Sequence, residues 1–182
     1  MKTRFSNPTH LKNLVLSAVF LALALVLPFL TGQISQLGNA LCPMHIPVLL
    51  CGFLCGWPGG LVVGFMAPLL RFVLYGMPPL FPTGVSMALE LATYGFMTGI
   101  LYKLFPKKIP FVYINLIISM IAGRLVWGAA RYLIAGFQNT AFGIHIFWAE
   151  AVTNAIPGII IQIILIPLVV IALKKSNRIV HE

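Results

Sequence analysis

The sequence predicts an all-α, polytopic integral membrane protein with six transmembrane helices and cytoplasmic N- and C-termini. Of its 182 residues, 60% are hydrophobic and only 8% are charged, whereas an ordinary soluble domain has roughly 25% charged residues. The apolar residues also form runs of the length that spans a bilayer, about 20 residues per helix. A soluble globular domain, a disordered tail and a disulfide-linked secreted module are therefore excluded.

Six apolar runs make up one predicted transmembrane domain over residues 1–182. They cover about 14–30, 44–56, 61–75, 85–104, 111–134 and 146–173. The first run is too long for the core of a signal peptide, and no small-x-small cleavage site follows it, so we expect a retained span. The second run is short and contains Pro47, which predicts a partial or broken helix. A turn at 57–60, a Pro-rich loop at 76–84 and a charged turn at 106–110 separate later spans.

The basic residues predict the orientation. They precede the first span, lie between the fourth and fifth, and follow the sixth, as Lys2, Arg4, Lys12, Lys103, Lys107, Lys108, Lys174, Lys175 and Arg178. The loops at 31–43, 76–84 and 135–145 contain no Lys or Arg. Because Lys and Arg favour the cytoplasmic side, six spans place all the basic ends in the cytoplasm and these three loops outside. The net charge of +9 thus reflects orientation and does not indicate nucleic-acid binding.

Five ionisable residues lie within the predicted spans, namely Arg71, Glu90, Arg124, Arg131 and Glu150. A charge in the membrane is costly and by default suggests function. All but Arg124 fall in the predicted outer half of the bilayer. Ion pairs such as Arg131–Glu150 or Arg71–Glu90 would only hold helices together. Three arginines outnumber two glutamates, however, so we expect surplus positive charge that suits a carboxylate or phosphate.

Helical spacing groups these charges with aromatic and amide side chains, because residues three, four or seven positions apart share a helix face. The shared faces hold Arg124, Trp127 and Arg131; Glu90 and Tyr94; and Glu150 and Asn154. The simplest arrangement brings the three faces to one cavity that opens to the outside. His45 and His145 are candidates for the mouth of this cavity, although a histidine in a loop is more often merely solvated.

Metal-ligand residue types occur close together at Cys42, His45, Cys51 and Cys55. A structural metal site needs four suitably spaced ligands, and two prolines interrupt this stretch. We therefore expect buried free cysteines, no metal and no cofactor. Neither a His-Glu-x-x-His nor a Gly-x-Ser-x-Gly signature is present, so we do not expect an enzyme. A phosphate-binding Gly-x-x-x-x-Gly-Lys-Ser/Thr loop is also missing, so energy for active transport must come from an ion gradient or a partner subunit.

Ala18 and Ala22, in the stretch AVFLA, are four residues apart in the first span. Small residues at this spacing let another helix approach closely, although alanine is also simply a good helix former. With this motif, the six spans and the stretch MHIPVLLCGFLCGWPGGLVVG at 44–64, the whole chain resembles the substrate-binding S components of energy-coupling-factor (ECF) vitamin transporters. Trp57 departs from the small or aliphatic residue expected in the inner turn.

The resemblance implies a mechanism. An S component in a prokaryotic cell membrane captures a micronutrient at the external face and docks through its first helix, here Ala18 and Ala22, on a transmembrane coupling subunit. Two ATPase subunits then drive a toppling that releases the substrate inside. The loop at 76–84 would form part of a lid. The implied substrate-binding residues are Gln36, Asn39, His45, Arg71, Glu90, Tyr94, Arg124, Trp127, Arg131, Glu150 and Asn154.

The expected substrate is a small water-soluble vitamin or precursor. Tyr94 and Trp127 suit a flat ring, and Arg124 and Arg131 suit an anionic or carbonyl-bearing group. Pyridoxine-like and pantothenate-like compounds are favoured, and riboflavin is a further candidate.

Three other functions compete with this interpretation. A stand-alone ion-coupled secondary transporter of a small organic anion would use Glu90 as the coupling carboxylate, but the chain is small and has no visible internal repeat. An intramembrane enzyme would use Glu90 or Glu150 with a histidine as acid and base. A purely structural membrane subunit would leave the five charges in the spans unexplained.

Overall fold

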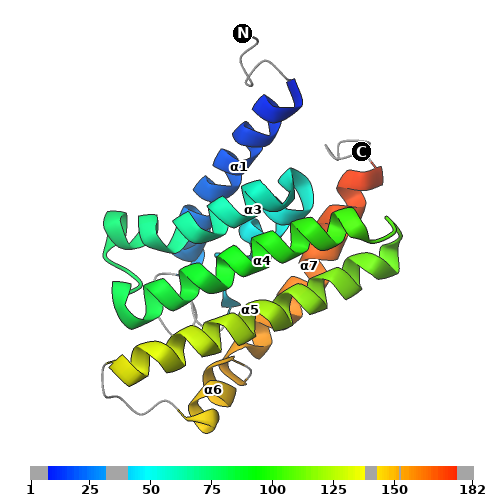
Figure 1. Cartoon of the computed structure of the whole chain (residues 1–182). Helices are drawn as coiled ribbons and strands as arrows, with labels where there is room; N and C mark the ends of the chain where they lie inside the picture. Colours follow the sequence, from blue (N-terminus) through cyan, green and yellow to red (C-terminus); the bar gives the residue numbers. More distant parts are fainter. Residues whose placement is uncertain (1–7, 32–40, 138–142, 152, 176–182) are drawn as a thin grey trace.

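The computed structural model describes residues 8–31, 41–137, 143–151 and 153–175, and within these ranges all regular structure is helical (Figure 1). This confirms the predicted all-α class. The long helices are α1 (Pro8–Val26), α3 (His45–Tyr75), α4 (Val85–Leu104), α5 (Ile109–Phe137) and α7 (Ile156–Lys175). The shorter elements are the 3₁₀ turns η1 (Leu27–Thr31) and η3 (Thr153–Ala155), the π-helical turn η2 (Leu80–Gly84) and the helix α6 (Ile144–Ala151).

Five helical stretches of the described chain are long and apolar enough to cross a membrane, one fewer than predicted. They cover His10–Phe29, His45–Tyr75, Leu80–Leu104, Ile109–Phe137 and Ile144–Lys175. The difference arises in α3, which contains both the second and the third predicted runs. The predicted turn at 57–60 is helical, and the backbone leaves the helical conformation at Gly56, with φ 79° and ψ 177°. Pro58 is tolerated because it falls in the first turn after this break, where its missing N–H is not needed.

The chain reverses direction at Gly56. A Cβ atom on Gly60 would lie 2.9 Å from the Cα atom of Gly52, whereas eight residues of straight helix span about 12 Å. The element α3 is therefore a hairpin with two helical arms, 45–55 and 57–75. Its backbone conformation at Gly56 is accessible essentially to glycine alone.

Helix α4 packs against this hairpin through glycines that bring the two backbones into contact. A Cβ atom on Gly95 would collide with the carbonyl oxygen of Gly60, and one on Gly64 would collide with that of Leu91. Small residues allow such close approach between membrane helices. Helix α5 packs against α4 as well, so α4 lies between α3 and α5 (Figure 1).

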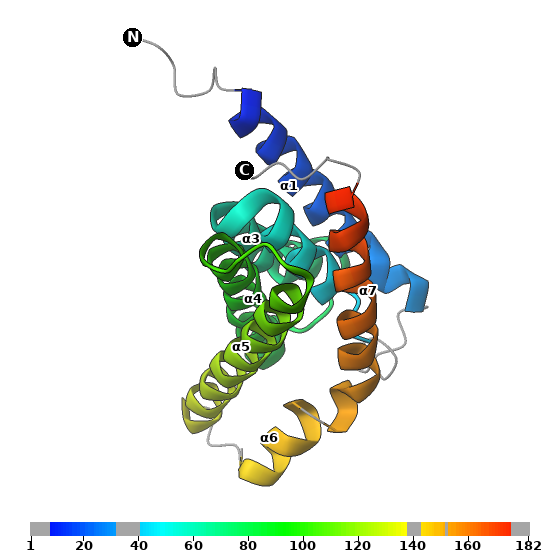
Figure 2. The ribbon, with the colours of Figure 1, turned by 90° about the vertical axis from the view of Figure 1, so that its right-hand side faces the viewer.

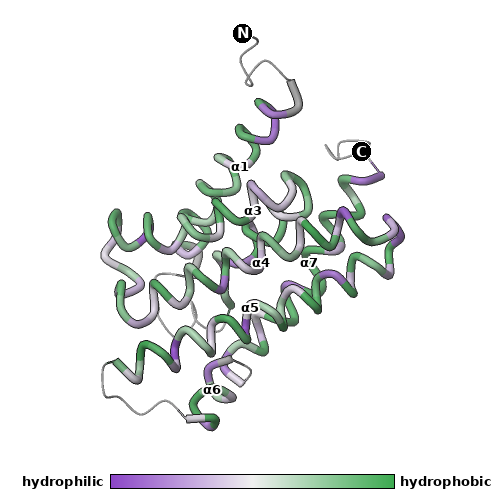
Figure 3. Tube along the Cα trace, viewed as in Figure 1, coloured by the Kyte–Doolittle hydropathy of each residue, from purple (hydrophilic) through white to green (hydrophobic). Residues whose placement is uncertain are grey.

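Helices α1 and α7 lie at the edge of this three-element core (Figure 2). Within their most apolar windows, only 17% of the α1 stretch and 28% of the α6–α7 stretch are buried in the protein. Most of the trace is apolar, as contact with lipid requires (Figure 3). Lys174 at the end of α7 donates a hydrogen bond to the carbonyl oxygen of Lys107, in the turn between α4 and α5. The basic end of α7 therefore lies beside the basic turn between α4 and α5. That both face the cytoplasm stays a prediction.

Candidate functional site

A buried polar cluster, which we call the inner cluster, joins α3, α4 and α5. It contains His45, Glu90, Tyr94 and Arg124. Glu90 is 2% exposed, and its Oε1 atom lies 3.1 Å from Nη1 of Arg124. The hydroxyl of Tyr94, one helical turn further along α4, donates a hydrogen bond of 2.9 Å to the same oxygen. The predicted faces of α4 and α5 therefore meet at Glu90.

His45 completes the inner cluster from the start of α3. It is 2% exposed, and its ring packs edge-on against Tyr94, with the ring centroids 5.4 Å apart. Its Nε2 atom lies 3.5 Å from Oε1 of Glu90, which is too long for a good hydrogen bond. Its Nδ1 atom is buried and has no hydrogen-bond partner among the described residues, and the same holds for Nε of Arg124. Buried polar atoms are costly to leave unpaired, so both atoms are suited to binding a ligand or water.

Two residues of this region were not predicted as site residues. Nη2 of Arg124 donates a hydrogen bond to Sγ of Cys42, with the two atoms 3.8 Å apart. Gly123 makes room for the ring of Tyr94, because a Cβ atom there would collide with that ring. Neither role has a signal in the sequence, since both depend on which helix packs against which.

A second cluster, the outer cluster, lies seven residues further along α5. Nη2 of Arg131 lies 3.3 Å from Oε2 of Glu150 on α6, which forms one of the two ion pairs considered from the sequence. The guanidinium of Arg131 also lies over the ring of Trp127, 5.8 Å from its centroid. Trp127 in turn contacts Phe147, with the ring centroids 6.2 Å apart. Trp127 is 7% exposed, while Arg131 and Glu150 are partly open to the surroundings.

Arg71 lies elsewhere. Its guanidinium donates a hydrogen bond of 3.1 Å to the carbonyl oxygen of Leu25 and lies over the rings of Phe29 and Tyr75. Arg71 therefore connects α3 to α1 and η1. The ion pair of Arg71 with Glu90 that was considered from the sequence does not form, because Glu90 pairs with Arg124 instead. The expected surplus of positive charge thus falls on Arg71, whereas each of the two clusters holds one arginine and one glutamate.

The remaining predicted residues have less defined surroundings. Asn154 is exposed in η3, and His145 is exposed in α6. Gln36 and Asn39 lie outside the described residues. Ala18 and Ala22 are exposed on α1, whereas Phe20 and Ala24 face the core.

The three cysteines are free and buried. Within the part of the chain that the structure describes, no three His, Cys, Asp or Glu side chains are grouped closely enough to hold a metal ion. Cys51 instead contacts Ser17, with its sulfur 3.7 Å from the hydroxyl oxygen.

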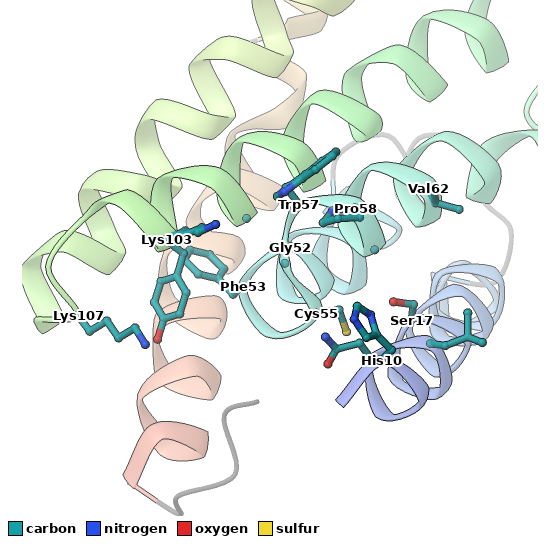
Figure 4. Close-up of a pocket in the computed structure, with 16 residues that line it drawn as sticks. His10, Ser17, Gly52, Phe53, Cys55, Trp57, Pro58, Val62, Lys103 and Lys107 are labelled. Atoms are coloured by element: carbon teal, nitrogen blue, oxygen red, sulfur yellow. The ribbon is translucent and has the colours of Figure 1, made fainter. Parts of the chain in front are cut away.

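A cavity of about 680 Å³, which was not predicted from the sequence, lies away from both clusters (Figure 4). It is bounded by the beginning of α1, the reversal of α3 at Gly56 and the end of α4. Its lining residues on α4, from Gly99 to Lys103, lie 9 to 13 residues after Glu90 on the same helix.

Comparison with known proteins identifies the family. The model of the ECF transporter substrate-specific component matches residues 12–170, which is most of the chain. Searches of curated proteins and of solved structures found no match. The family agrees with the resemblance drawn from the sequence and with the apolar helices, and it describes a substrate-binding transport subunit of a prokaryotic membrane rather than an enzyme. The chain belongs to the family of substrate-specific components of ECF transporters.

Proposed function

We propose that this S component captures a small water-soluble vitamin or precursor at the external face of the cell membrane. It then delivers the compound by toppling on a module made of a transmembrane coupling subunit and two ATPase subunits. The family match supports the general role. The exposed Ala18 and Ala22 on the sparsely packed α1 support docking through this helix.

The proposed binding site extends along α5 from the inner to the outer cluster. The observation that carries this proposal is that Nδ1 of His45 and Nε of Arg124 are buried and have no hydrogen-bond partner among the described residues. A ligand that reaches them would satisfy both atoms. Glu90 and Tyr94 would fix the position of Arg124, and Trp127, Arg131 and Glu150 would contact the other end of the ligand. Asn154 and the loop residues Gln36 and Asn39 complete the proposed set, from which we leave out Arg71.

The charge balance favours one ligand class. Each cluster pairs one arginine with one glutamate, so an anion would have to compete with a carboxylate that is already in place. A heteroaromatic ligand without net charge would instead pack on Trp127 and form hydrogen bonds with His45. This favours a pyridoxine-like compound over a pantothenate-like one, with riboflavin as a further candidate.

The test begins with the purified protein alone in detergent. Denaturation and mass spectrometry of the released small molecules should identify a stoichiometric, vitamin-like compound. A panel of vitamins, followed by tryptophan fluorescence, should then show tighter binding of uncharged ring compounds than of their carboxylated or phosphorylated forms. Trp127→Phe should remove most of the fluorescence change, while Trp57→Phe should retain it. The absence of any bound compound, together with no response across the panel, would contradict the capture role.

The alternative is a stand-alone, ion-coupled secondary transporter of a small organic anion. The buried carboxylate of Glu90 is the observation that favours it. The ion pair with Arg124 opposes it, because the carboxylate of Glu90 already has a buried basic partner and so is not free to bind a coupling ion. Protein reconstituted alone in liposomes should accumulate substrate on an ion gradient only if this alternative is correct.

A further inference from the structure

Gln162 on α7 is a buried polar side chain that belongs to neither cluster. It is 1% exposed, and its Oε1 atom has no hydrogen-bond partner among the described residues. Every other side chain from Ile156 to Leu173 consists of carbon and hydrogen alone. A buried amide that lacks a partner is costly in such an apolar setting. The side chain is therefore suited to a ligand or a water molecule that hydrogen-bonds to it.

Helix α7 packs against the elements that hold two further atoms of this kind. It contacts both α3 and α5, where Nδ1 of His45 and Nε of Arg124 are likewise buried and have no hydrogen-bond partner within the described chain. Ile166 and Val170, which follow Gln162 by four and eight residues, are buried in the hydrophobic core that includes residues of α3 and α5. Because residues four positions apart share a helix face, the amide lies on the core side of α7.

The depth of Gln162 follows from the common end of α4 and α7. The hydrogen bond from Lys174 to the carbonyl oxygen of Lys107 joins the end of α7 to the turn that follows α4. Gln162 precedes Lys174 by 12 residues, and Tyr94 precedes Lys107 by 13. Because a helix rises by about 1.5 Å per residue, we place Gln162 near the level of Tyr94, which belongs to the inner cluster.

We propose that Gln162 is a specificity-determining residue of the substrate site, and that its amide hydrogen-bonds to a hydroxyl group, or to an N–H beside a carbonyl, on the substrate. This inference rests on the proposed function. A side-chain amide carries both an acceptor and donors, so its best complement is a group that can donate and accept. The amide adds no charge, which agrees with the uncharged ligand favoured by the two ion pairs. The substrate class thus narrows to a ring compound that carries a hydroxyl group or a lactam.

The first test compares the removal of two buried amides in the ligand-free protein. Gln162→Met keeps the length of the side chain and removes an amide oxygen that has no partner in the described chain, so the melting temperature in detergent should stay the same or rise. Asn115→Leu is the matched contrast, because Asn115 donates to the carbonyl oxygen of Thr98 and accepts from Ser119. Its melting temperature should fall by about 2–4 °C or more.

The second test measures ligand binding by titration calorimetry. Gln162→Met should bind pyridoxine roughly tenfold or more weakly, whereas Ile164→Met, at an exposed position of α7, should change the affinity less than about twofold. At least one of the three deoxypyridoxines, each of which lacks one hydroxyl group, should bind the unmodified protein roughly tenfold more weakly than pyridoxine. In Gln162→Met this preference should shrink to less than about twofold, because the hydroxyl no longer has its partner.

Riboflavin allows the same comparison if it is the compound that the unmodified protein binds, because methylation of its lactam nitrogen removes the N–H. A lower melting temperature of Gln162→Met with unchanged affinity would assign the amide a structural role and overturn the inference. An undiminished preference for the hydroxyl or the N–H in this variant would do the same. Full affinity in Gln162→Met would overturn this inference alone, whereas no binding by the unmodified protein would overturn the proposed function as well.

Discussion

Glu90 and Arg124 form an ion pair inside a membrane-spanning stretch, with Oε1 and Nη1 3.1 Å apart. Removing one partner of a buried pair leaves an uncompensated charge, which costs about 3–5 kcal/mol. We therefore expect Glu90→Gln and Arg124→Met each to lower the free energy of unfolding by about that amount, measured by denaturant unfolding in detergent. The double variant should regain much of the loss and still fail to bind ligand. Losses that simply add in the double variant would contradict coupling between the two side chains.

The thiol of Cys42 provides a test of burial next to the inner cluster. Burial raises its pKa, and the neighbouring Arg124 guanidinium lowers it only in part. A raised pKa keeps the thiol protonated at pH 8, so the reactive thiolate is scarce. In the variant Cys51→Ala/Cys55→Ala, we expect iodoacetamide to modify Cys42 more than about tenfold slower in the folded protein than in denaturing detergent. The rate in the folded protein should rise with pH, and similar rates in both states would show that Cys42 is accessible.

Individual side chains were predictable where spacing along one helix decides the outcome. The shared faces of Glu90 with Tyr94, and of Arg124 with Trp127 and Arg131, follow from 3.6 residues per turn. Which arginine pairs with Glu90 depends on contacts between helices, and so could not be read from one segment. Arg71 shows this, because aromatic rings and a backbone carbonyl satisfy it instead of a carboxylate.

The contact between α3 and α4 depends on glycine at positions where the backbones touch. In Gly95→Ala the new methyl group would collide with the carbonyl oxygen of Gly60, and this backbone atom cannot rotate away. We expect a loss of about 1–3 kcal/mol or more in the free energy of unfolding. Gly136→Ala on α5 is the matched control, because its methyl group would meet nothing within 4 Å and alanine favours helix. Equal stability of the two variants would contradict the close packing.

The exposed face of α1 is expected to dock the coupling subunit. Ala18→Trp or Ala22→Trp should abolish uptake into cells and leave ligand binding by the purified S component unchanged, because both residues are exposed and outside the proposed site. Val73→Trp, at an exposed position of α3, should leave both activities intact. Loss of binding together with uptake would count against a docking face.

The boundaries of the helices were predictable to different degrees. The fourth predicted span, 85–104, coincides with α4, because Gly84 and the Pro-rich loop precede it and a charged turn follows it. The sixth predicted span, 146–173, is divided into α6, η3 and α7. Here a proline at position 157 begins a new helix, as proline does in a first turn. The reversal within α3 was predicted at 57–60 and lies one residue earlier, at Gly56, in a backbone conformation that is open essentially to glycine alone.

Across the whole molecule, the two polar clusters and the cavity are separated along α4 and α5. The inner and outer clusters lie along the half of α5 that runs toward Phe137, and the cavity lies at the end of α4. The proposed substrate site and the cavity therefore lie toward different ends of α4. The distribution of charges along the sequence predicted basic residues at one end and the candidate substrate site toward the other. The cavity itself arises only when α1, α3 and α4 are assembled.

The backbone contacts between the hairpin and α4 also determine how the protein can move. Side chains that interdigitate can exchange rotamers and let helices slide, but glycines that touch through their main chains offer no such adjustment. We therefore expect the two arms of α3 and α4 to move together as one rigid unit. A rigid unit of this kind would let the proposed toppling carry the ligand without bending α3 or α4.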